Sequence, residues 1–149
     1  HTLYKYDNYY LFCVFVGTSL PDANRYFSTM HLLVDDIIKY ADLAIEGKNS
    51  ASADLRFGHD TVLLPLVGYL KIYGMENWSA FDQVNSVWNS SVSICMGSNL
   101  QMIFYRNKSG DVLVKLMYNE KETTIPALQT FSGPYYKWSD LKEYFKSLL

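Results

Sequence analysis

The residues best suited to chemistry are a neighbouring histidine and aspartate, His59 and Asp60. They follow Gly58, where a short apolar segment, Leu55 to Phe57, gives way to residues with helical spacing. We expect a buried strand that ends at the glycine and leads into a helix. The first N–H groups of such a helix have no internal partner and suit an anion such as phosphate. An imidazole and a carboxyl group at the carboxyl edge of an α/β sheet can bind charge and transfer a proton.

The same two residues also have a purely structural interpretation. Asp60 can accept backbone N–H bonds as a helix cap, and His59 can be a satisfied residue at the end of a strand. The pattern of residues does not by itself separate this interpretation from the chemical one.

Upstream of this stretch, apolar residues recur every three or four positions from about residue 22 to residue 46. This spacing predicts a long amphipathic helix, with Ser19 as a possible cap and Gly47 just beyond its end. His31 and Asp35 would share one face of the helix. Because no third metal ligand accompanies them, we expect a solvated helix face rather than a metal site.

Downstream of Asp60, the apolar residues from Val62 to Ile72 predict a mostly buried helix that stops at Gly74. Pro65 falls in its early turns, where a missing N–H costs least. The aromatic-rich residues 1–18 are compatible with a strand or with a short buried helix, since a continuous apolar run is ambiguous.

The C-terminal third of the chain contains the clearest strand patterns. Leu100 to Tyr105 and Val112 to Tyr118 read as strands, joined by a hairpin loop at Asn107 to Gly110. A third extended piece is expected over residues 123–128. Ser139 is expected to cap a final amphipathic helix.

Composition narrows the class of protein. The chain has 149 residues, of which 49% are hydrophobic and 19% charged, which is typical of one folded domain rather than a disordered chain. A net charge of -2 without a basic run argues against nucleic-acid binding. The longest apolar run, Tyr9 to Val16, is too short to span a bilayer. Cys13 and Cys95 could pair or remain as buried free thiols, and their spacing does not suggest a metal site.

The stretch from Asp54 to Leu66 closely resembles the second signature of the histidine acid phosphatases, the phytase-like branch of the histidine phosphatase superfamily. The residues of this stretch are most similar to those of the multiple inositol polyphosphate phosphatases. Gly97 to Tyr105, Leu116 to Lys121 and the closing helix also resemble the C-terminal portion of that family. The resemblance implies an α/β fold in which this chain supplies part of a phosphoglycerate-mutase-like sheet flanked by helices, together with the hairpin and the C-terminal helix.

One departure from the family concerns the proton donor. The inositol polyphosphate enzymes usually carry His-Ala-Glu, whereas this chain has His59-Asp60-Thr61. The His-Asp pair is the form of the wider acid phosphatase and phytase group. The resemblance implies that His59 holds the phosphate, that Asp60 protonates the leaving oxygen, and that Thr61, in the place of the Glu, lies at the phosphate. Since a donor must be protonated, we expect activity to favour acidic pH.

The second departure is that the nucleophile of the family is absent. It is the histidine of an Arg-His-Gly-x-Arg-x-Pro motif, which this chain lacks. We therefore expect a single domain over residues 1–149 that is the C-terminal portion of a larger enzyme and is inactive alone. Its expected partners are the N-terminal portion and a phosphorylated small molecule such as an inositol polyphosphate, with no cofactor, metal, nucleic acid or membrane span. The resemblance implies a periplasmic or secreted location. The alternative is a non-catalytic domain that binds phosphate or a partner.

Overall fold

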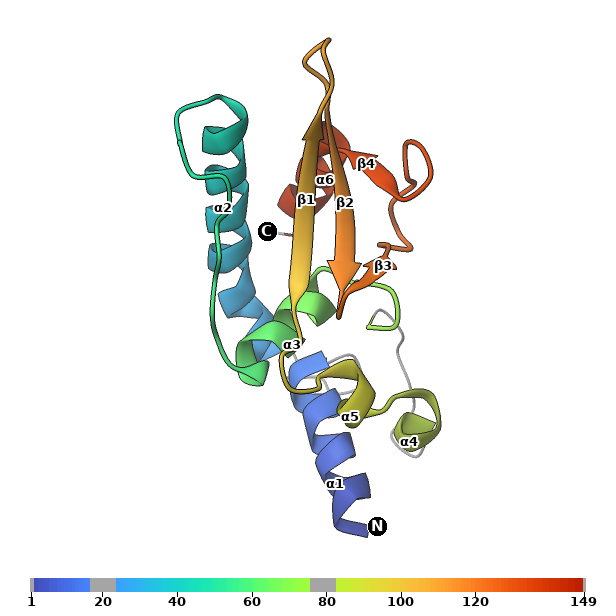
Figure 1. The fold of residues 1–149 in the computed structure, drawn as a ribbon. Helices are drawn as coiled ribbons and strands as arrows, with labels where there is room; N and C mark the ends of the chain where they lie inside the picture. Colours follow the sequence, from blue (N-terminus) through green and yellow to red (C-terminus); the bar gives the residue numbers. More distant parts are fainter. Residues whose placement is uncertain (1, 17–23, 76–82, 149) are drawn as a thin grey trace.

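The computed structural model describes residues 2–16, 24–75 and 83–148. Over these residues the protein is a mixed α/β structure with six α-helices, one π-helical turn and a four-stranded sheet (Figure 1). The helical elements are α1 (Thr2–Leu11), the π-helical turn (Phe12–Val16), α2 (Asn24–Ile45), α3 (Asp60–Tyr69), α4 (Val84–Val87), α5 (Ser90–Ser93) and α6 (Trp138–Ser147). The sheet lies with α2 and α6, whereas the labelled elements around α1 are the helices α3, α4 and α5 (Figure 1).

The sheet is antiparallel and open. Its strands are β1 (Leu100–Arg106), β2 (Val112–Tyr118), β3 (Lys121–Thr123) and β4 (Tyr135–Lys137). β2 pairs with β1 along its whole length and with β3 and β4 on its other side. The predicted hairpin is confirmed. The predicted third extended piece lies earlier than expected, because Asn119 and Glu120 both adopt positive φ (49° and 62°) and reverse the chain in two residues.

One face of the sheet is buried under helices. Strand alternation assigns Val114 and Leu116 of β2 to this face, and Tyr136 of β4 lies opposite Val114. All three are fully buried, as are Leu141 and Phe145, which lie one turn apart on α6. This shared core fixes α6 against the sheet.

Two predicted helices are observed with changed ends. The long helix is confirmed as α2, and Gly47 beyond its end has the positive φ (71°) that favours glycine. Its predicted start near Ser19 lies outside the described residues. The expectation that Ser139 caps the final helix is wrong, because α6 begins at Trp138 after Lys137, and the Ser139 hydroxyl donates to the carboxylate of Asp140.

Helix α3 packs against the N-terminal helical residues. Residues 2–16, whose apolar sequence was compatible with a strand or a helix, are helical, and the π-helical turn packs against α3. Leu64, Val67 and Leu70 are fully buried, as the predicted apolar helix requires. The helix ends at Tyr69 rather than at Gly74, because Lys71 adopts a positive φ of 53°. Pro65, the sixth residue of α3, lies in its second turn, as expected.

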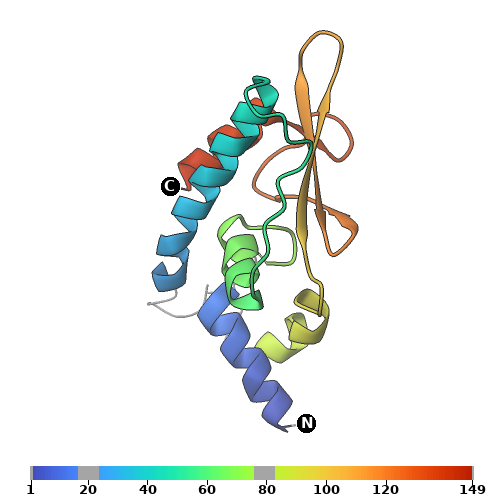
Figure 2. The same cartoon turned by 60° about the vertical axis from the view of Figure 1, so that its left-hand side comes forward.

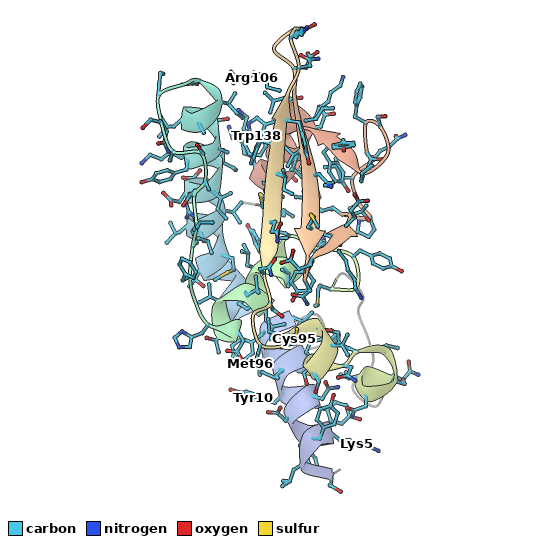
Figure 3. All side chains as sticks on the ribbon, viewed as in Figure 1. Lys5, Tyr10, Cys95, Met96, Arg106 and Trp138 are labelled. Carbon is cyan, nitrogen blue, oxygen red and sulfur yellow. The ribbon has the colours of Figure 1, made fainter. Side chains whose placement is uncertain are left out.

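Neither cysteine forms a disulfide bond. Cys13 is buried, as expected in its apolar setting, but Cys95 is exposed, so the expectation of two buried thiols is wrong for Cys95. Cys95 follows the short helix α5 and lies beside the exposed Met96 (Figure 3). No helix in the described ranges is both long and apolar enough to cross a membrane.

A polar cluster joins α2 to α6. Asp42 accepts hydrogen bonds from Trp138 Nε1 at 2.8 Å and from Lys142 Nζ at 3.1 Å. Above it, Arg106 at the end of β1 donates to the carbonyl of Ile45 at the end of α2 (Figure 3). Partial burial of Asp42 disfavours its charged form, but the hydrogen bonds from Trp138 and Lys142 outweigh this effect and lower its pKa.

Asp42→Asn is expected to lower the free energy of unfolding at neutral pH by about 1 kcal/mol, since the cluster is partly exposed. Because the pKa of Asp42 is lowered in the folded protein, the contribution is present above the unfolded pKa and disappears as pH falls through the folded value. Urea unfolding of both proteins at neutral pH and at about pH 3 measures this. Asp35→Asn, on the exposed face of the same helix, is the control. A loss that is the same at both pH values would contradict the prediction.

Candidate functional site

The predicted site lies at the beginning of α3. His59 precedes the helix with an extended backbone (φ −94°, ψ 165°), and Asp60 is the first helical residue. The carbonyl of His59 accepts the N–H groups of Val62 at 3.0 Å and Leu63 at 3.1 Å, which closes the first turn. The expectation that His59 and Asp60 stand where a helix begins is therefore confirmed.

The side chains of the site are exposed. His59, Asp60 and Thr61 all face solvent, and the imidazole makes no capping hydrogen bond. One carboxylate oxygen of Asp60 accepts the N–H of Thr61 at 2.8 Å. No other hydrogen bond or ion pair of the His59 or Asp60 side chain is found in the described part of the chain. An imidazole, a carboxylate and a hydroxyl group are thus displayed together at a helix N-terminus, where the helix dipole favours an anion.

The segment before the site differs from the prediction. Leu55 to Phe57 is neither a strand nor buried: the side chains of Leu55 and Phe57 are 74% and 94% exposed. The reason is that the sheet of the described residues is built entirely from the C-terminal part of the chain, and none of its strands pairs with this segment. The prediction of a buried strand over Leu55 to Phe57 is therefore wrong for the described structure.

Arg56, within this segment, is held by α2 and does not point to the site as a free cation. Its Nη1 lies 2.7 Å from Asp36 Oδ2, and its Nη2 lies 2.8 Å from Asp54 Oδ2. The guanidinium also lies 5.4 Å from the centre of the Tyr40 ring. Partial burial lowers the pKa of Arg56, but the two carboxylates outweigh this effect and raise it. These contacts give Arg56 a structural role.

The contact between Arg56 and Asp36 could not be predicted from the sequence. The two residues are separated by 20 positions, and the sequence contains only the neighbouring Asp54–Arg56 pair as a signal. The contact matters because it fixes the segment before His59 against α2 (Figure 2).

The other candidate residues do not assemble into a site. His31 and Asp35 are both exposed on α2. In the ranges that the structure describes, no group of three or more His, Cys, Asp or Glu side chains could hold a metal ion.

Comparison with known protein families and with characterised proteins gives no match to this chain.

Proposed function

We propose that this chain is the C-terminal part of a histidine acid phosphatase that hydrolyses phosphomonoesters of the inositol polyphosphate type. The observation that carries the proposal is the joint display of His59, Asp60 and Thr61 at the N-terminus of α3. The motif resemblance requires this placement, and a helix N-terminus with exposed polar side chains is suited to a phosphate group.

The proposed reaction divides its groups between two parts of the enzyme. A histidine of the N-terminal portion attacks phosphorus in line, forming a phosphohistidine, and the P–O bond to the leaving alcohol breaks. His59 donates to a phosphate oxygen, Thr61 contacts the same phosphate, and Asp60 transfers its proton to the leaving oxygen. Water then attacks the phosphohistidine, loses its proton to the Asp60 carboxylate, and releases inorganic phosphate and the free histidine.

Asp60 is the residue that such a reaction needs for natural substrates. An alkoxide such as that of an inositol ring is a poor leaving group at neutral pH, so the departing oxygen must be protonated in the transition state. The single hydrogen bond from Thr61 N–H engages one carboxylate oxygen and leaves the other for the proton. This supports the assignment of Asp60 as the acid.

The proposed function also implies a fold for the assembled enzyme. In the assembled enzyme the segment over residues 53–58 becomes a strand of a phosphoglycerate-mutase-like sheet, and the exposed Leu55 and Phe57 are covered there. Since members of the family mostly act outside the cytoplasm, we also place this enzyme in the periplasm or outside the cell.

The proposal is tested by reconstitution. The polypeptide encoded upstream is expressed with this chain, and release of phosphate from phytate is measured for each part and for the mixture. We expect neither part alone to be active and the mixture to be active at acidic pH. Vigorous hydrolysis by this chain alone would refute the proposal that the catalytic groups are divided between the two parts of the enzyme. An upstream sequence without Arg-His-Gly, together with an inactive mixture, would favour the non-catalytic alternative.

A further inference from the structure

The segment over residues 53–58 reaches His59 with few contacts of its own. It runs as an elongated trace from the end of α2 to the start of α3 (Figure 2), and every residue in it is exposed. Within the described part of the chain, Arg56 makes the only hydrogen bonds and ion pairs that join this segment to another element. The position of the segment relative to α2 therefore depends on one guanidinium group.

That guanidinium group contacts two carboxylates that belong to different elements. Asp54 lies in the segment itself, so its pair with Arg56, at 2.8 Å, moves with the segment. Asp36 lies on α2, and its Oδ2 is 2.7 Å from Nη1 of Arg56. Tyr40, one turn further along α2, adds the ring contact at 5.4 Å. Only Asp36 and Tyr40 can hold the segment against the helix.

The link between Arg56 and His59 is not fixed by packing. Phe57 is 94% exposed, and a side chain at Gly58 would meet nothing closer than Val62 Cβ, at 3.8 Å. Glycine also has the largest backbone freedom of any residue. The carbonyl of His59 is fixed by the first turn of α3, but its N–H side is held only through this link. The anchor at Arg56 therefore limits the directions that the imidazole can take.

We propose that Arg56 is a positioning residue for His59 and acts through its ion pair with Asp36. The inference rests on the proposed function for the reaction that His59 serves. Both ends of the guanidinium group are engaged by carboxylates, so Arg56 acts on the reaction through His59 rather than by binding phosphate. A donor that is held in place before the substrate arrives loses less freedom in the transition state, and a small misplacement costs a large factor in rate.

A purely electrostatic role for Arg56 predicts the opposite result for Asp36→Asn. If Arg56 only offset acidic charge beside the phosphate, loss of the Asp36 carboxylate would strengthen phosphate binding. If Arg56 positions His59, the same change breaks the bridge to α2 and slows the reaction. Asp54→Asn is the matched control, because it removes the same charge from a side chain that is also 44% exposed and also paired with Arg56, but leaves the bridge to α2 intact.

The kinetic test uses the reconstituted enzyme with an inositol phosphate. Arg56→Gln and Asp36→Asn are expected to lower kcat roughly tenfold with a smaller change in KM, and Asp54→Asn to change kcat by about twofold at most. The double variant of Arg56→Gln and Asp36→Asn should be no slower than either single variant, since both break one contact. Arg56→Lys keeps a cation for Asp36 and should recover part of the rate, but its ammonium lacks the planar fork that spans both carboxylates.

A second measurement involves no catalysis and uses the complete chain alone. The ¹⁵N order parameters of the Phe57 and Gly58 amides are expected to fall from roughly 0.8 to about 0.6 or below in Arg56→Gln and in Asp36→Asn. They should stay unchanged in Asp54→Asn. Unchanged order parameters within α3 verify that each variant is folded.

Three results would overturn the inference. They are unchanged order parameters in Asp36→Asn, an equal fall in Asp54→Asn, and an active mixture in which Asp36→Asn is as fast as the unaltered enzyme or faster. An inactive mixture of the unaltered parts would reject the proposed function instead. The order parameters would then still decide whether Arg56 and Asp36 hold the segment that precedes His59.

Discussion

Asp60→Asn in the reconstituted enzyme is expected to slow hydrolysis of an inositol phosphate about a hundredfold to ten-thousandfold, and hydrolysis of nitrophenyl phosphate far less. The difference arises because nitrophenolate leaves readily without a proton, whereas an inositol alkoxide does not. Asparagine keeps the size of the side chain and its oxygen acceptor for the Thr61 N–H, so α3 should begin as before. The measurement is kcat/KM for both substrates with both proteins.

A matched control is available on α6. Asp140 is also an exposed aspartate in the first turn of a helix, and Asp140→Asn is expected to leave both rates unchanged. Equal losses on both substrates in Asp60→Asn would remove Asp60 as the proton donor and leave it as a residue that positions phosphate.

The sequence predicted those helices and strands whose pattern of apolar and polar residues lies within the element itself. The helical period of α2, the apolar and aromatic runs of β1 and β2 and the polar loop between these strands are properties of consecutive residues, and all three elements are observed. Ends were predicted less well, because they depend on single backbone conformations. Lys71 adopts a positive φ without being glycine, so no residue type announced where α3 stops.

At the candidate site, too, local features were predicted and contacts between distant residues were not. That His59 and Asp60 begin a helix follows from residue order, since Gly58 breaks the preceding pattern and apolar helical spacing starts directly after it. Burial of Leu55 and Phe57 was inferred from their apolar character, but burial is a property of the whole assembly and requires a cover that the described residues do not provide. The contact of Arg56 with Asp36 likewise joins distant parts of the chain.

The exposed segment over residues 53–58 leads directly into the candidate site at His59. A strand that pairs with residues 53–58 would bury Leu55 and Phe57, and burial of apolar side chains of this size stabilises an assembly by about 1.5 to 3 kcal/mol each. The same pairing would exclude water from the start of α3, where hydrogen bonds to a phosphate gain strength in a drier environment. Assembly and formation of the phosphate site are thus expected to occur together.

His59→Ala is expected to lower kcat/KM of the reconstituted enzyme about a hundredfold to a thousandfold, the effect of removing one donor to a charged transition state. The loss should be the same for inositol phosphate and nitrophenyl phosphate, because a ligand of the transferred phosphate does not distinguish between leaving groups. His59→Gln, which keeps an N–H donor, should recover part of the rate. Steady-state rates on both substrates measure these effects.

His31→Ala is the control, since His31 is exposed on α2 and the proposed reaction does not use it. The pattern across variants is the decisive feature: His59→Ala should act on both substrates, Asp60→Asn chiefly on the one with the poor leaving group, and His31→Ala on neither. Full activity in His59→Ala would instead leave His59 with a structural role only. Its backbone carbonyl closes the first turn of α3, and that contact does not depend on the side chain. The donor to the phosphate would then have to come entirely from the N-terminal portion.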